Sequence, residues 1–342
     1  MEDIRLNVSL LRRKVPNLTA AAKAAGIRPA TVSNLCTGKI DLGKAEVRTL
    51  VGLAELAHCT VDELILRGEK MKMIETRIKA FDFFAPLVKG GTTGVVARPG
   101  MGQLVIVAEL LHRFKEQELK TIFLAPSKVH AELEGTTELA DHVANSIQET
   151  LSLLKAYEEK AVLITDKSRV DSGELFELQE ALGRVSVTTL LVDLSGEVVD
   201  DDFPFGPLET VWQLDADLAA RHQYPALSPL HSASSLMEEA ELDERHLQLR
   251  QRTQKTLRRY RELRSIVQAR GFDRLQPAEI DMYRKGERLE AYFTQPFYVA
   301  EEFTKTQGAA VPLEQTLSDV EAILQGQTDN RKVEELQFIG AL

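Results

Sequence analysis

A short glycine-bearing segment, A-R-P-G-M-G-Q-L at residues 97–104, has the residue types and position of a phosphate-binding loop. It follows an apolar stretch, TTGVV, and precedes a helical pattern, VIVAELLHRF. Loops of the pattern GxxxxGK[ST] place Lys on the β- and γ-phosphates and Ser or Thr on Mg²⁺. Here Ala97 takes the first glycine position, Gly102 the second, Gln103 the lysine and Leu104 the hydroxyl. Taken alone, the segment fits either a degenerate phosphate loop or a simple turn.

The composition indicates an ordinary globular protein without metal or disulfide. Its 342 residues are 44% hydrophobic and 27% charged, and the length predicts two or three domains. Cys36 and Cys59 are isolated, and the seven histidines lack metal-ligand spacing. We expect no transmembrane helix, no secretory signal and no membrane partner, and hence a cytoplasmic protein.

The net charge of −10 is unevenly distributed along the chain. Residues 1–70 carry 11 basic and 8 acidic side chains, a net of +3, so the rest carries −13. Anionic nucleic acid would be repelled by the body and tolerated by the first 70 residues.

The first part of the chain reads as five short helices. Thr19 is a candidate N-cap, Gly26 a helix stop, and about three residues join the second and third helices, as in a helix-turn-helix. The predicted helices lie at 6–14, 18–26, 28–38, 44–57 and 60–68.

The text LTAAAKAAGIRPATVSNLCTGK resembles helix-turn-helix domains of the Cro/repressor type. In that family the helix beginning near Arg28 enters the major groove, where its N-terminal end reaches the bases. Ala20 replaces a glutamine that often contacts phosphate in this family. A five-helix domain used only for protein contacts is the alternative. The resemblance implies DNA contacts by Thr19, Arg28, Pro29, Ala30, Ser33, Asn34 and Lys39.

From about residue 75, apolar strand-length runs alternate with helical patterns. This alternation predicts a parallel sheet with helices on both faces. The predicted strands are 92–97, 120–125, 160–166, 187–193 and 209–215, and the helices between them 102–116, 138–157 and 173–183. The remainder predicts helices at 241–270, 279–292, 297–304 and 313–324.

The body resembles the nucleotide-binding and C-terminal helical domains of the catalytic beta subunit of F-type ATP synthases. The matching text lies in family order at 75–111, 213–237, 256–275 and 289–326. The family's N-terminal β-barrel is absent, and the segment that resembles a helix-turn-helix domain occupies its position in the chain. The resemblance implies a RecA-like fold and side-by-side assembly into rings.

The same resemblance implies that the hydrolytic residues are lost. Gln103 replaces the charged lysine and Leu104 the Mg²⁺-binding hydroxyl. Asp166, at the end of the strand KAVLITD, keeps the carboxylate on the metal side of the family's site. In the family the catalytic Glu lies in a segment that here reads LAPSKVHAELEG. No Glu stands at the matching position, and the residue near it is Ser127 or Lys128. Ser235 replaces a family arginine. We therefore expect no ATP hydrolysis and no metal.

Three aromatic residues match the family's adenine pocket, namely Tyr224, Phe293 and Phe297. With Gly100, Gly102 and the helix N-terminus, they are candidates for ATP or ADP binding. Arg98 would supply part of the missing lysine charge. The alternative is that these aromatics persist as packing, and no cofactor is then required.

The sequence thus predicts an all-α helix-turn-helix domain at 1–68, a linker at 69–74, a RecA-like α/β domain at 75–238 and a C-terminal helical bundle at 239–342. The leading interpretation is a DNA-binding transcriptional regulator whose inactive ATPase-like body forms a homo-oligomer, either a dimer or a ring. The alternatives are a non-catalytic partner or decoy of ATP synthase subunits, and a residual ATPase.

Overall fold

The computed structural model describes residues 4–7, 10–11, 14–15, 18–36, 40–67, 72–126, 133–183, 185–194, 205, 208–238 and 242–342. The chain divides into two compact units. The smaller unit is Met1–Lys72 with Ser235–Glu244, and the larger is Met73–Ser234 with Arg245–Leu342.

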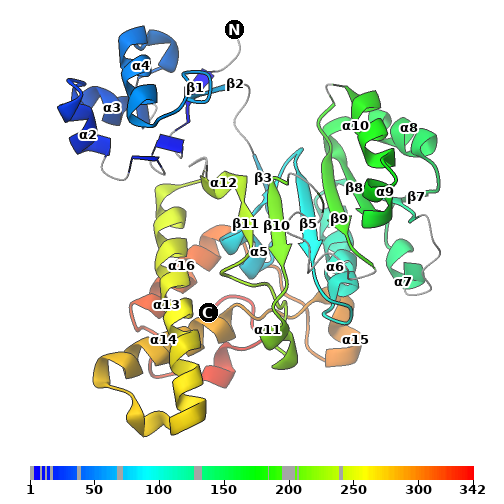
Figure 1. The fold of residues 1–342 in the computed structure, drawn as a ribbon. Helices are drawn as coiled ribbons and strands as arrows, with labels where there is room; N and C mark the ends of the chain where they lie inside the picture. The colour runs from blue at the N-terminus through cyan, green and yellow to red at the C-terminus, as the bar shows by residue number, and fades with distance from the viewer. Residues whose placement is uncertain are drawn as a thin grey trace. The chain divides into compact units, whose positions relative to one another are not determined.

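A seven-stranded sheet forms the centre of the larger unit (Figure 1). Its order is β11-β10-β5-β9-β8-β6-β7, and every neighbouring pair is parallel except β10 with β11. The parallel α/β prediction is therefore confirmed. The strands are β5 (Thr92–Val96), β6 (Lys120–Leu124), β7 (His142–Ala144), β8 (Ala161–Asp166), β9 (Thr188–Val192), β10 (Thr210–Gln213) and β11 (Ala233–Ser234).

Alternate side chains of the central strands enter two different hydrophobic clusters. In β9, Leu190 and Val192 join one cluster and Leu191 the other. Because successive side chains of a strand point to opposite faces, both faces of the sheet are buried. One face packs against α5 (Lys79–Phe84) and α6 (Gln103–Glu116), and the other against α8 (Ile147–Tyr157) and α10 (Glu174–Leu182).

The C-terminal helices share the first of these clusters. Leu257, Leu289 and Val320 pack with residues of the sheet and of α6, so the sheet and these helices have one common core. These helices are α13 (Glu244–Arg270), α14 (Pro277–Tyr292) and α16 (Leu313–Leu324), whereas the short α15 (Glu301–Thr304) has no buried residue.

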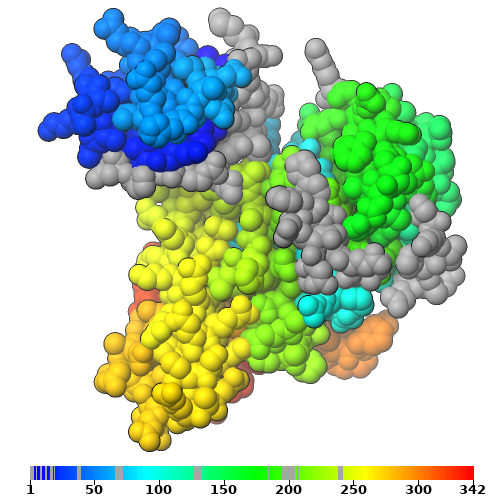
Figure 2. Space-filling view, viewed as in Figure 1, coloured from blue at the N-terminus to red at the C-terminus, as the bar shows by residue number. Residues whose placement is uncertain are grey.

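The hairpin of α13 and α14 projects from the rest of its unit, with the short helix η5 (Phe272–Arg274) at its tip (yellow to light orange in Figures 1 and 2). Among the described residues, no helix is both long and apolar enough to cross a membrane.

Short elements complete the larger unit. They are β3 (Met73–Ile74), β4 (Leu87–Val88), α7 (Glu134–Thr137), η3 (Glu158–Lys160), α9 (Lys167–Asp171), α11 (Ala216–Ala220), η6 (Tyr298–Ala300) and η7 (Val333–Leu336). The predicted helix 138–157 begins only at Ile147, after β7, because Ser146 caps it by accepting a hydrogen bond from Glu149 N at 3.3 Å.

The smaller unit is built around its own apolar cluster, which includes Leu11, Val32 and Leu53. Its elements are β1 (Ile4–Leu6), α2 (Leu18–Ala24), α3 (Pro29–Cys36), η1 (Leu42–Lys44), α4 (Val47–Leu56) and β2 (Ile65–Arg67), with α12 (Ser235–Glu238) grouped with them.

The helix predicted at 60–68 is wrong. Glu63 accepts hydrogen bonds from Thr60 N at 2.6 Å and Thr60 Oγ1 at 2.9 Å, which closes a turn. The following residues then form β2, which pairs antiparallel with β1. The non-local strand pairing outcompetes the local helical pattern.

Candidate functional site

The segment 97–102 forms a glycine turn between β5 and α6. Gly100 (φ +80°) and Gly102 (φ +89°) both adopt left-handed backbone conformations, which side-chain-bearing residues seldom adopt. Gly102 is the N-cap of α6, and its carbonyl accepts a hydrogen bond from Ile106 N at 3.1 Å. The strand, the turn and the helix of a phosphate loop are therefore present in that order.

The two reactive positions of the loop carry no charge and no hydroxyl. Gln103 is 7% exposed, and its Nε2 donates a long hydrogen bond of 3.5 Å to Asp193 O at the end of β9. Its Oε1 has no hydrogen-bond partner within the described residues. Leu104 is partly buried against the hydrophobic core. The turn can thus present backbone N–H groups, and neither of these side chains can supply charge to a phosphate.

Asp166, at the carboxyl end of β8, is used as a helix cap. Its Oδ1 accepts a hydrogen bond from Ser168 N at 2.9 Å and its Oδ2 one from Leu194 N at 3.1 Å. The side chain is 5% exposed. In the part of the chain that the structure describes, no group of three or more His, Cys, Asp or Glu side chains could hold a metal ion.

A cavity of about 550 Å³ opens beside the glycine turn. It brings together four of the predicted site residues, Gly100, Gly102, Tyr224 and Phe297. The Tyr224 ring faces the turn, since a Cβ placed on Gly102 would lie 3.9 Å from Tyr224 Cε1. The other lining residues are Met101, Val105, Ile106, His222, Pro225, Gln295, Pro296, Ala300, Thr304, Thr306 and Phe338. A volume of this size accommodates a small organic molecule.

Comparison with known proteins agrees with this fold. The chain is 28% identical to ATP synthase subunit beta 2 of Bradyrhizobium sp. strain BTAi1, in an alignment that covers 83% of this chain and 72% of that protein.

This chain is similar to ATP synthase beta subunits.

The fold is shared with a solved structure, that of a unique ATP synthase subunit, NeqB, from Nanoarcheaum equitans. The TM-score is 0.56 at 16% identity, covering 74% of this chain and 76% of NeqB. No family model matches the sequence. These comparisons support the predicted ATP synthase likeness and give no support to a helix-turn-helix domain.

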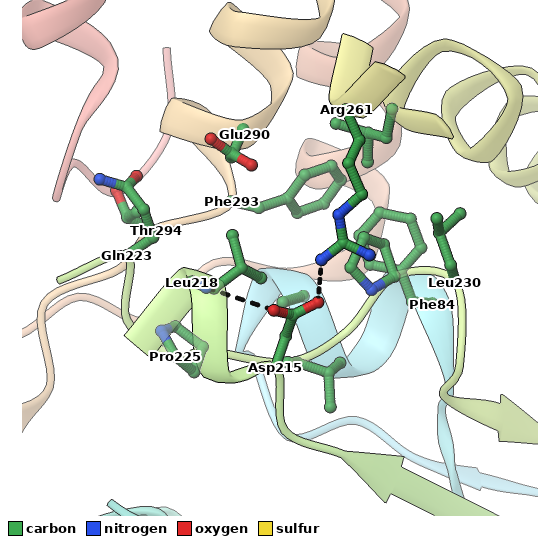
Figure 3. A pocket seen from close by; sticks show the side chains of 14 residues that line it. Phe84, Asp215, Leu218, Gln223, Pro225, Leu230, Arg261, Glu290, Phe293 and Thr294 are labelled. Carbon is green, nitrogen blue, oxygen red and sulfur yellow. Dashed lines mark hydrogen bonds and ion pairs between the residues drawn. The ribbon is translucent and has the colours of Figure 1, made fainter. Parts of the chain in front are cut away.

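Phe293, predicted to form an adenine pocket together with Tyr224 and Phe297, lies outside the cavity. Its ring packs in the core, with its centroid 4.5 Å from that of Phe84 and 5.2 Å from that of Phe83. It lines a separate cavity of only about 40 Å³, where Asp215 pairs with Arg261 (Figure 3). That space holds at most a few water molecules.

Arg98, predicted to replace part of the missing lysine charge, is exposed and lines a different cavity, of about 310 Å³. This cavity also contains Ser228 and His231, whose Oγ and Nδ1 are 3.0 Å apart. The structure therefore does not bring Arg98 to the cavity that holds Tyr224 and Phe297.

Two further residues from the beta-subunit comparison, Ser127 and Lys128, lie outside the described residues. Ser235 begins α12 and groups with the smaller unit.

The predicted DNA-contacting residues lie on two helices of the smaller unit. Thr19 is in α2, and a turn at Gly26 (φ +75°) leads to Arg28, which directly precedes α3. Arg28, Ala30 and Ser33 are exposed, and Pro29 and Asn34 are half-buried. Lys39 lies outside the described residues.

Sequence reasoning missed most of the cavity wall. Phe338 comes from the C-terminal segment and His222 from the turn after α11, and no motif marks either of them. Thr304 and Thr306 lie within ten residues of Phe297 in the sequence. This proximity to a predicted site residue was the one signal that could have indicated them.

Proposed function

We propose that this chain is a non-catalytic, ATP synthase beta-like protein that acts as an interaction partner of ATP synthase subunits. The observation that carries the proposal is the phosphate-loop turn, whose two reactive positions hold the buried amide of Gln103 and the apolar Leu104. The protein thus keeps the framework of the site without the groups that perform its chemistry.

Phosphoryl transfer depends almost wholly on positioning and on charge that stabilises the transferring group. Gln103 is neutral and turned toward Asp193 O, and Leu104 cannot ligate Mg²⁺. Asp166 already accepts hydrogen bonds from two backbone N–H groups. We therefore expect no hydrolysis.

The partnership is inferred from the similarity to ATP synthase beta subunits and from the fold shared with an ATP synthase subunit over 74% of this chain. A protein with this fold can be expected to have side faces that fit other RecA-like domains, including copies of itself. A subunit that occupies such a position without hydrolysing ATP would regulate or cap the assembly it joins.

Two measurements on the full chain test this proposal. In a phosphate-release assay with Mg-ATP, we expect turnover at background. Turnover that the Asp166→Asn variant abolishes would contradict the proposal, because contaminating ATPases would be unaffected.

In the second measurement, the chain is mixed with a purified ATP synthase alpha subunit and the mass of the complexes is measured in solution. We expect a complex that survives moderate salt, with an unrelated acidic protein of similar size as the control. Elution of both proteins as separate species at micromolar concentration would reject the partnership.

A second candidate function is DNA binding by the smaller unit. The observation in its favour is the pair α2 and α3, joined by a tight turn at Gly26, with Arg28, Ala30 and Ser33 exposed at the start of α3. The N-terminal end of a recognition helix is the part that reaches base edges.

A further inference from the structure

We propose that a basic stripe on α13 of one copy docks on an acidic face of α10 in a second copy of this chain. Both surfaces belong to the larger unit. The basic stripe consists of Arg252, Lys255 and Arg258, and the acidic face of Phe176, Glu177 and Glu180.

The helix α13 is basic in a chain that is acidic as a whole. Its 27 residues include nine Lys or Arg and two Glu, a net of +7, whereas the whole chain carries −10. Some of these cations pair with carboxylates of the same unit, such as Arg259 with Glu279 at 2.7 Å and Arg264 with Asp217 at 2.5 Å. The basic stripe lies on the part of the helix that these pairs leave uncompensated.

The three cations of the basic stripe are exposed, and they make no ion pair within the residues that the structure describes. Thr253 and Leu257, between them in sequence, are buried, so the stripe faces away from the core. Side chains three residues apart are neighbours on a helix, and these three span about 9 Å of its axis. Neighbouring like charges repel one another, so a partner that brings carboxylates to the stripe relieves this repulsion.

The acidic face of α10 has the complementary chemistry. The helix contains no Lys or Arg, and its leucines are buried while Phe176 is 59% exposed. Glu177 and Glu180 are exposed and, among the described residues, have no cationic partner. Aromatic side chains are enriched where proteins associate, and burying Phe176 would add apolar contact to the charge pairs.

One chain cannot bring these two surfaces together. Leu249 and Leu257 of α13 belong to the hydrophobic cluster on one face of the sheet, and Leu175 and Leu178 of α10 to the cluster on the other face. Figure 1 shows the α13–α14 hairpin and α10 at opposite ends of the larger unit. Each copy therefore offers one basic stripe and one acidic face, and the contact between copies repeats head to tail.

A second copy fits the basic stripe better than a nucleic acid does. Glu177 and Glu180 have the same three-residue spacing as Lys255 and Arg258, so two helices laid side by side can pair both charges. A nucleic acid carries many more charges than three cations offset, and the net charge of −10 repels it. Between copies, about 0.1 M salt screens charges more than about 10 Å apart, while pairs in contact persist.

The first test is sedimentation equilibrium of the full chain at about 100 µM in about 0.1 M salt. Because exposed ion pairs are individually weak, we expect a reversible association with an average mass above the 38.2 kDa of one chain. The mass should fall toward that value in about 1 M salt, where the Debye length is about 3 Å. A chain that stays single in 0.1 M salt, or an association that salt strengthens, overturns the inference.

Charge reversal locates the contact. Lys255→Glu with Arg258→Glu, and separately Glu177→Lys with Glu180→Lys, should each weaken the association at least about tenfold, because like charges then face each other. An equal mixture of the two double variants should associate again, since every reversed surface finds its complement. This recovery also shows that both variants are folded. A mixture that stays at the mass of one chain contradicts the pairing.

The control is Lys115→Glu with Lys332→Glu, which makes the same change in net charge at exposed positions outside both surfaces. It should associate as the wild type does, and an equal loss would show that only net charge matters.

The alternative occupant has its own outcome. Wild-type chains that stay single and bind a duplex oligonucleotide through Lys255 and Arg258 would make the basic stripe a nucleic-acid surface and overturn the inference. A single chain that still binds the ATP synthase alpha subunit defeats this inference alone. Self-association without an alpha-subunit complex defeats the proposed partnership alone.

Discussion

Lys79 shows how strongly a single residue can be constrained by this fold. It is fully buried, and its Nζ donates to Ile339 O at 2.9 Å and Gly340 O at 3.1 Å. The Nζ also lies 4.1 Å from the centroid of the Tyr292 ring. Burial lowers the pKa of Lys79 from 10.5 to about 7, and the charge of Asp319 opposes this shift. The side chain thus ties the C-terminal segment that carries Phe338 to α5.

This lowered pKa predicts a pH dependence of stability. Between pH 7 and 10.5 the unfolded chain binds more protons at this position than the folded chain, so stability rises with pH. Compared with Lys79→Met, the wild-type free energy of unfolding should gain up to about 1.4 kcal/mol per pH unit. Urea unfolding between pH 7 and 10 measures the difference. Lys115→Met, at an exposed position, is the control. A difference that falls with pH would refute this account of Lys79.

At the scale of elements, a buried ion pair within α6 connects this helix to the segment around residues 299–309. Arg113 Nε donates to Glu109 Oε1 at 2.7 Å, and both side chains are at most 2% exposed. Arg113 also donates to Arg77 O at 2.9 Å and Ala309 O at 2.8 Å. The other oxygen of Glu109 accepts from Val299 N at 3.1 Å. The helix that begins at the glycine turn is thereby held against the strip that carries Phe297.

Removing one partner of this pair should be costly. Arg113→Met leaves Glu109 buried without its cation, and we expect a loss of about 3–5 kcal/mol in the free energy of unfolding. Arg259→Met removes a cation that is 42% exposed and should cost less than about 1 kcal/mol. Chemical denaturation measures both variants. Similar losses in the two would show that the buried pair has no special role.

At the scale of the whole molecule, charge and division into units point to separate roles for the two parts. Residues 1–70 are net positive, and the remainder is strongly negative. The smaller unit has its own apolar cluster, and the larger unit shares one core between sheet and C-terminal helices. If the chain binds DNA, the net charges favour contact through the smaller unit.

The second candidate function makes a prediction at this scale. If the smaller unit binds DNA, the full chain should shift duplex fragments at low salt and lose affinity as salt rises. Arg28→Gln should weaken binding several-fold, whereas Arg331→Gln in the acidic body should not. Electrophoretic shift assays measure both variants. Absence of a shift at low salt, or equal effects of the two substitutions, would reject this function.

The local pattern of apolar residues was sufficient to predict most strands of the sheet, and the residues of one short segment were sufficient to predict part of the site. Five of the seven strands were predicted. Four of them, β5, β6, β8 and β9, have runs of consecutive buried residues, as a strand covered on both faces requires, whereas β10 alternates between buried and half-buried residues. The glycine turn and its uncharged reactive positions also follow from eight consecutive residues. β7, of three residues, is too short to interrupt a helical pattern.

What the sequence by itself determined is the order of the five longer strands of the sheet and the chemistry missing from the loop, since both depend on residues adjacent in the chain. Tertiary structure alone decided which aromatic residues share a cavity. Phe293 and Phe297 are four positions apart, yet one packs in the core and the other lines the cavity. Phe338 joins Phe297 because the C-terminal segment packs back onto Thr294, a contact between residues 44 positions apart. Such long-range packing leaves no periodic signal in the chain, so the binding surface could not be predicted from the loop that borders it.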